Sequence, residues 1–147
     1  MGSATVLINM TTTNDRKKVT KAKSAASFSS EAYAQIPLPP QVSFEEAFSR
    51  LDPDTNSFYR LELDQESYMQ CGGSQSPCAV EARRADADGV CRSYAIGKEP
   101  TESTPFQVRM SMGGVWVRRS EVLTVDDAAL LFNCFLVGHH TRKSLRN

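Results

Sequence analysis

The chain has 147 residues, of which 40% are apolar, and this length suits one domain with one hydrophobic core. Its 17 basic and 17 acidic residues give a formal net charge of zero, which argues against the dense basic face of a nucleic-acid-binding protein. The sequence contains neither an apolar run of about 18 residues nor a secretory leader pattern. We therefore expect a cytoplasmic protein with no membrane or nucleic-acid partner.

Residues 1–36 are predicted to be a disordered basic arm and lead-in, and residues 37–147 a single α+β domain. Up to residue 30 the chain is rich in Thr, Ser, Lys and Ala without apolar periodicity, which leaves little to pack. The basic residues of this arm are Arg16, Lys17, Lys18, Lys21 and Lys23. Pro37, Pro39 and Pro40 then predict a stiff, extended lead-in to the folded part.

A short first helix is predicted over residues 44–51. Ser43 and Glu46 have the spacing of a capping box, in which each side chain bonds a free backbone N–H group near the helix start. The apolar residues of the segment, Phe44, Ala47, Phe48 and Leu51, share one helical face. We expect that face to pack on the core.

Alternating apolar and polar residues predict a series of short strands after residue 56. The predicted strands are residues 57–64, 67–71, 78–84, 90–96, 106–112 and 115–118. Turns are predicted at the Gly72-Gly73 and Asp88-Gly89 pairs, the second of which suits a tight hairpin. The result is an antiparallel meander sheet of about six strands.

The last helix is predicted over residues 124–137, with Gly138 placed to stop it. Thr124 supplies a side-chain cap, and Asp126 and Asp127 place negative charge in the first turn, where the helix dipole favours it. From residue 128 to residue 137 only Asn133 is polar, so we expect this helix to be buried on more than one side. The fold class is therefore α+β, an antiparallel meander sheet packed by a C-terminal helix and a short N-terminal helix.

No catalytic or metal-binding pattern is evident in the sequence. The cysteines, Cys71, Cys78, Cys91 and Cys134, lack C-x-x-C spacing, and both histidines, His139 and His140, follow the last core helix. No phosphate-binding glycine loop follows a strand. We therefore expect no enzyme activity, no metal and no cofactor. Reduced thiols are the default in this compartment, and a disulfide between Cys71 and Cys78 is the alternative that their spacing allows.

Two groups of charged residues are candidate partner-binding sites. The first is an acidic run, Glu45, Glu46, Asp52, Asp54, Glu62, Asp64 and Glu66, which would attract a basic partner such as a nuclease. The second is the polar set Glu81, Arg83, Arg92 and Tyr94 on two neighbouring strands, which would share a sheet face if the hairpin register allows it.

The chain resembles the immunity proteins of bacterial polymorphic toxin systems, most closely the Imm1-like group. The resemblance spans residues 57–138 and rests on five segments: Leu61-Glu-Leu-Asp, Ser67-Tyr-Met-Gln-Cys-Gly-Gly-Ser, Val80-Glu-Ala-Arg, Tyr94-Ala-Ile-Gly, and Glu121-Val-Leu with Asp126-Asp127-Ala-Ala-Leu-Leu-Phe. It implies a cytoplasmic α+β domain that binds a cognate secreted toxin and often blocks the active site of that toxin.

Three functional hypotheses follow. The first is a non-enzymatic immunity protein that neutralises a toxin through either charged group. The second is a small-ligand-binding or enzymatic domain that uses Glu81, Arg83, Arg92 and Tyr94 in an enclosed pocket. The third is a structural subunit with an exposed apolar patch that includes Phe106, Met110, Met112 or Trp116.

Overall fold

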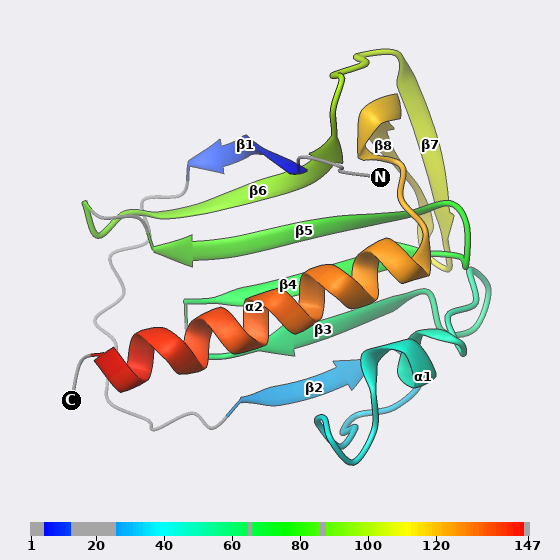
Figure 1. Ribbon diagram of the computed structural model, residues 1–147. Helices are drawn as coiled ribbons and strands as arrows, with labels where there is room; N and C mark the ends of the chain where they lie inside the picture. Colours follow the sequence, from blue (N-terminus) through cyan, green and yellow to red (C-terminus); the bar gives the residue numbers. More distant parts are fainter. Residues whose placement is uncertain (1–4, 13–25, 65, 86–87, 146–147) are drawn as a thin grey trace.

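The computed structural model describes residues 5–12, 26–64, 66–85 and 88–145, with side chains described between residues 26 and 139. Six antiparallel strands form the main sheet in the spatial order β1-β6-β5-β4-β3-β2 (Figure 1). They are β1 (Thr5–Thr12), β2 (Ser27–Ser30), β3 (Phe58–Glu62), β4 (Tyr68–Gly73), β5 (Cys78–Ala85) and β6 (Cys91–Lys98). The consecutive neighbours β3 to β6 are the first four strands of the predicted meander.

The remaining elements are two helices, a separate hairpin and a 3-10 turn. They are α1 (Phe44–Phe48), β7 (Pro105–Met110), β8 (Gly113–Arg118), η1 (Arg119–Glu121) and α2 (Val125–Leu145). Figure 1 shows α2 lying across one face of the sheet, with α1 beside it near β2 and β3. The predicted α+β class is confirmed. No helix in the described part of the chain is long and apolar enough to span a membrane.

The edges of the sheet differ from the prediction. The predicted strands 106–112 and 115–118 pair with each other as β7 and β8 and do not join the main sheet. The edge positions belong instead to β1 and β2, which both fall within residues 1–36, so the predicted disordered arm is wrong for residues 5–12 and 26–36. A short run of β-branched and apolar residues is enough to form an edge strand once β6 offers a free edge. The basic residues of the arm lie outside the described residues.

The two faces of the sheet have different chemistry because side chains alternate along each strand. The helix face, which packs under α2, is apolar and includes Tyr59, Leu61, Leu63, Met69, Cys71, Cys78, Val80, Ala82 and Ile96, all of them buried. The open face is polar and includes Arg60, Glu62, Tyr68, Gln70, Glu81 and Arg83. The predicted alternation of the four central strands is therefore confirmed.

An aromatic cluster joins both helices to the helix face. Phe132 of α2 packs edge-on against Phe48 of α1, with ring centroids 4.9 Å apart, and Phe28 of β2 lies 5.2 Å from Phe44. Tyr59 of β3 packs against Phe48 at 5.1 Å and donates its hydroxyl to the Ala47 carbonyl at 2.6 Å. Each of these aromatic rings is at most 2% exposed. The cluster therefore fixes α1 and α2 against strands that are distant in the sequence.

The start of α2 is fixed by side-chain caps. The Asp127 carboxylate accepts the Thr124 backbone N–H at 3.0 Å, and the Asp127 N–H donates to the Thr124 hydroxyl at 3.3 Å. Lys98 of β6 adds an ion pair to Asp127 at 2.8 Å. Partial burial opposes ionisation of Asp127, but the Lys98 and Thr124 contacts outweigh it and lower the pKa of this carboxyl.

Two glycine predictions need correction. Gly138 does not end the last helix, because its backbone stays helical and α2 continues to Leu145. The Gly72-Gly73 pair is the end of β4 and not a turn, which forms instead over residues 74–77. Glycine is needed at position 73, where φ is 124° and a Cβ would lie 2.6 Å from Val108 Cγ1 and 2.7 Å from the Pro77 carbonyl oxygen. A Cβ on Gly72 would lie 2.6 Å from Met110 Cε, the flexible end of that side chain. The pair leaves room for β7.

The aromatic cluster gives the first testable prediction. Phe132→Ala is expected to lower the free energy of unfolding by about 3–5 kcal/mol, because it removes a ring that touches three other aromatic side chains and leaves a cavity. Urea denaturation measures the change. Met112→Ala is the matched control, since Met112 is 90% exposed and its truncation leaves no cavity. Equal losses in the two variants would contradict the assigned core.

Candidate functional site

The polar set predicted on β5 and β6 is divided between the two faces of the sheet. In the register of these strands Ala82 lies opposite Tyr94 and Arg84 opposite Arg92, which places Tyr94 and Arg92 on the helix face. Glu81 and Arg83 lie on the open face. The prediction that these four side chains share one face is wrong, because a shift of one residue in register moves a side chain to the other side.

Glu81 instead takes part in a cross-strand cluster on the open face. The Tyr68 hydroxyl donates to the Glu81 carboxylate at 3.1 Å, and the Arg60 guanidinium lies 3.8 Å from the centroid of the Tyr68 ring. Burial and the neighbouring Glu81 carboxylate raise the pKa of Tyr68. Arg60 also pairs with Glu62 at 2.8 Å. These pairs stabilise a solvated sheet face.

The acidic run is likewise divided, into three places. Glu45 and Glu46 lie on α1, where Glu45 accepts a hydrogen bond from Asn133 of α2 at 3.2 Å. Asp52 and Asp54 lie in the loop before β3. The others, Glu62, Asp64 and Glu66, lie at the far end of β3 and in the turn to β4. Because β3 has five residues at about 3.3 Å each, roughly 15 Å separates the last two groups. The predicted single acidic patch is therefore wrong.

The β7–β8 hairpin is the element that brings distant polar residues together. Its inner face packs on the end of the main sheet through Val108, which is 1% exposed, and through Met110 beside Gly72. Its outer face consists of Pro105, Gln107, Arg109, Gly114, Trp116 and Arg118, all exposed. Gln107 lies across Gly114, where a Cβ would come 2.1 Å from its Nε2. The hairpin is thus a flap with one buried face and one open face.

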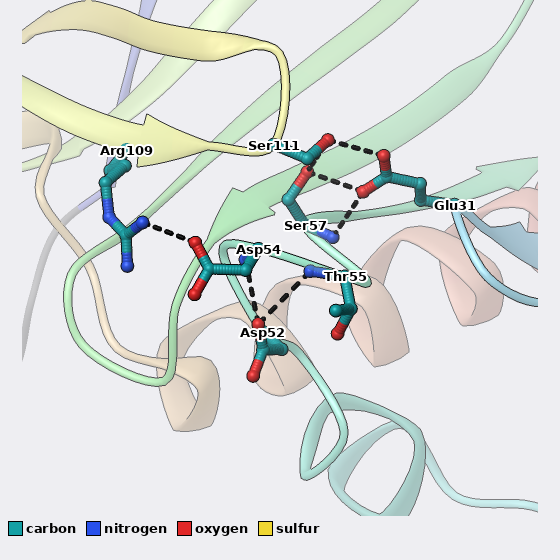
Figure 2. Close-up of polar contacts among 7 residues, drawn as sticks. All are labelled: Glu31, Asp52, Asp54, Thr55, Ser57, Arg109 and Ser111. Atoms are coloured by element: carbon teal, nitrogen blue, oxygen red, sulfur yellow. Dashed lines mark hydrogen bonds and ion pairs between the residues drawn. The ribbon is translucent and has the colours of Figure 1, made fainter.

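A carboxylate and two hydroxyls fasten the tip of this flap to the body (Figure 2). Glu31 accepts the backbone N–H and the hydroxyl of Ser57, both at 2.8 Å, and its second oxygen accepts the Ser111 hydroxyl. The hydrogen bonds from Ser111 and Ser57 lower the pKa of Glu31, so this carboxyl is ionised at neutral pH. The tip is therefore tied to two segments far away in the sequence.

A second contact joins the outer face of the flap to the loop that contains Asp52 and Asp54. Arg109 forms an ion pair with Asp54, and Asp52 fixes the loop by accepting the N–H groups of Asp54 at 2.8 Å and Thr55 at 3.2 Å (Figure 2). A shallow depression of about 450 Å³ lies between Asp54 and the flap, lined also by Gln107, Arg109 and Ser111. Asp52 and Asp54 are the members of the predicted acidic run that lie at the flap.

Exposed apolar side chains lie on the same flap. Met112 at its tip is 90% exposed, Trp116 is 64% exposed and Val115 is 46% exposed. We call Met112, Trp116 and Arg109 the hairpin surface, because Val115 pairs with buried Val108 and lies on the inner face of the flap. Large apolar side chains gathered on one small element are unusual on a surface that contacts only water. Of the apolar residues proposed for an exposed patch, Phe106 and Met110 are only partly exposed.

The three buried cysteines, Cys71, Cys78 and Cys91, are unsuited to nucleophilic chemistry. Cys71 and Cys78 are free, buried thiols, so the disulfide alternative is not present. Burial raises the pKa of Cys78 to about 12 and that of Cys71 well above its usual value. Burial and then Glu66 raise the pKa of Cys91. Within residues 26–64, 66–85 and 88–139, no three His, Cys, Asp or Glu side chains are grouped to bind a metal ion.

The sequence prediction missed Glu31, Ser57, Arg109 and Ser111 as site residues. Glu31 and Ser111 are 80 positions apart, and no local pattern relates them. The exposed face of the hairpin did have a signal, because Trp116 and Arg118 alternate with the valines of β8.

Comparison of the chain with protein-family models, with curated proteins and with solved structures found no match. The site must therefore be interpreted from its own geometry.

The Glu31 contacts predict a pH-dependent attachment of the flap. The pKa of Glu31 is lower in the folded state than its unfolded value of about 4.3, so the ionised carboxylate stabilises the attachment of the flap above about pH 4.3. This stabilisation is lost as the pH falls through the folded pKa. The Ser57 amide resonance, followed by NMR from pH 7 to acid, is expected to titrate with a midpoint below about 4.3.

Glu31→Gln is expected to abolish this titration and to increase amide hydrogen exchange in β7 and β8. Glu102→Gln is the matched control, because Glu102 is exposed and lies 4.0 Å from Arg119 without contacting Ser57 or Ser111. An unchanged Ser57 titration in Glu31→Gln would contradict the assigned contact.

Proposed function

We propose that this chain is a non-enzymatic binding protein that neutralises a secreted bacterial toxin by direct contact through the hairpin surface. The observation that carries the proposal is the exposure of Trp116, at 64%, on a flap whose opposite face is packed on the body. Tryptophan and arginine are the side chains that most often dominate the energy of protein interfaces. Trp116 and Arg109 lie on the same outward face of the hairpin.

The attachment of the flap favours binding energetically. Binding costs less conformational entropy when the contact residues are already held in place. The Glu31 contacts hold the tip, and the ion pair between Arg109 and Asp54 holds the outer face. Trp116 is therefore presented on a preorganised surface.

The shape of the surface favours a protein over a small molecule. The depression beside Asp54 and Arg109 is shallow and open to solvent, whereas small-ligand sites are typically enclosed and largely apolar. It is wide enough to receive a side chain of a protein partner. The competing hypothesis of a ligand site at Glu81, Arg83, Arg92 and Tyr94 loses its geometric basis, because these residues lie on two faces of the sheet.

A toxin is proposed as the partner because of the resemblance of residues 57–138 to immunity proteins of polymorphic toxin systems. The proposal places the contact at the hairpin and at the adjoining carboxylates of Asp52 and Asp54. The remaining residues of the acidic run lie on other parts of the surface and are not included in it.

The test begins with affinity capture of the tagged protein from a lysate of its source cells, followed by mass spectrometry. We expect one stoichiometric partner with a toxin-like C-terminal domain, and we expect co-expression of this chain to restore growth to cells that produce that domain. Trp116→Ser is expected to weaken binding of the purified domain by at least about 2 kcal/mol, or roughly 30-fold in Kd, as titration calorimetry would measure.

Tyr33→Ser is the matched control, because Tyr33 is an aromatic residue that is 45% exposed and is not one of the residues of the hairpin surface. Its effect on Kd is expected to stay within about 0.5 kcal/mol. Equal effects of the two substitutions would exclude the hairpin surface as the interface. Failure of the chain to rescue growth, with both proteins folded and expressed, would exclude the immunity function itself.

A further inference from the structure

The β7–β8 hairpin carries positive charge and no acidic side chain of its own. Between residues 105 and 118 the only charged residues are Arg109 and Arg118. Both share the outer face of the flap with Trp116, because side chains alternate along each strand. Arg118 is two positions from Trp116 on β8, or roughly 7 Å along the strand. The exposed tryptophan is therefore bordered by basic side chains.

The carboxylates beside the flap are already engaged. Asp54 pairs with Arg109, and Asp52 accepts two backbone N–H groups of its own loop. Glu31 holds the flap tip through three hydrogen bonds. Arg118, by contrast, is exposed, and no carboxylate of the described residues forms an ion pair with it. Its guanidinium is therefore a cation on the outer face whose counter-ion a partner can supply.

Packing within the flap leaves the Trp116 ring open. Gln107 is the direct cross-strand neighbour of Trp116, but its side chain lies across Gly114, where a Cβ would come 2.1 Å from Gln107 Nε2. The glycine provides the space that Gln107 occupies, and Trp116 stays 64% exposed. An apolar ring beside a guanidinium is complementary to a segment that combines an apolar side chain with a carboxylate.

We propose that the partner segment that covers Trp116 is acidic and that one of its carboxylates binds the Arg118 guanidinium. The proposal rests on the function proposed above and specifies the chemistry of the partner at that surface. A carboxylate matches the planar fork of an arginine with two parallel hydrogen bonds. Exclusion of water by the contact with Trp116 makes this pair stronger than one exposed to solvent.

This partner chemistry differs from the basic partner that the acidic run suggests. Of that run only Asp52 and Asp54 lie at the flap, and both are engaged there. The hairpin itself is positive. A contact with its outer face therefore selects an acidic segment, even where the partner is basic elsewhere.

A nucleic-acid strand fits this surface less well. A tryptophan beside an arginine can also stack on a base and bind a phosphate. Two arginines make a small basic surface, however, and the carboxylates of Glu31, Asp52 and Asp54 beside the flap oppose a phosphate backbone. The charges therefore favour an acidic protein segment over a nucleic acid.

The first test uses the purified full chain alone. Trp116 is its single tryptophan, so quenching of tryptophan fluorescence by iodide and by caesium compares the two ion concentrations at this surface. Relative to a neutral tryptophan amide, we expect iodide to quench at least about twofold more strongly than caesium, since a unit charge at about 7 Å in water changes the energy of an ion by about RT. Arg118→Gln is expected to remove most of this preference.

Arg50→Gln is the matched control, because Arg50 is an exposed arginine that follows α1, outside the hairpin. It is expected to keep the preference for iodide. Equal quenching of the wild type by the two ions would overturn the proposal. A change of Trp116 fluorescence on addition of a 20-nucleotide single-stranded DNA would overturn it in favour of a nucleic acid.

The second test measures the association rate of the captured partner by stopped flow. Arg118→Glu is expected to slow association by roughly threefold or more at low salt, and added salt is expected to reduce the difference. Arg50→Glu, the same charge change outside the hairpin, is expected to have a smaller effect.

The outcomes separate this proposal from the proposed function. If Trp116→Ser weakens binding while Arg118→Glu leaves the association rate unchanged or raises it, the acidic segment is wrong and the hairpin interface stands. If Trp116→Ser leaves binding unchanged, the hairpin interface and the acidic segment both fail.

Discussion

The structure depends on the packing of Phe132 against the aromatic rings of β2 and α1. Phe132 lies 4.9 Å from Phe48, 5.5 Å from Phe44 and 6.3 Å from Phe28, ring centroid to centroid. These contacts close the helix face of the sheet with segments from both ends of the described chain. Because this face is closed, the aromatic cluster itself is not available to a partner.

The position of the flap follows from the glycine pair at the end of β4. Side chains at Gly72 and Gly73 would occupy the space of Met110 and Val108, so these glycines allow β7 to pack on the sheet. Once β7 is packed, strand alternation turns Arg109 and Trp116 to solvent. Glu31 and Asp54 then fix the tip and the outer face, respectively. The hairpin surface thus results from core packing, from the contact of Glu31 with Ser111 at the tip and from the ion pair of Asp54 with Arg109.

Much of the fold was predictable from the sequence, since it is determined locally. Period-two alternation identified β3 to β6 and their buried faces, and the Ser43 and Thr124 caps marked the starts of α1 and α2. The edges of the sheet were not predictable. Long-range pairing, and not the composition of β1 or β7, decides which of these strands joins the main sheet. The split of Glu81 and Arg83 from Arg92 and Tyr94 depended on the register across the turn between β5 and β6, where one residue decides the face. The Glu31 contacts join segments 26 and 80 positions apart, for which a single sequence carries no signal.

The central claim is that a protein partner covers the outer face of the flap. The most direct measurement is amide hydrogen exchange of the intact chain, alone and bound to the captured partner, resolved by peptide. The account predicts that binding adds protection in β8 and at the flap tip, over residues 111–118, and in the loop of Asp52 and Asp54. Protection confined to the open face of β3 to β5, with residues 111–118 unchanged, would contradict it.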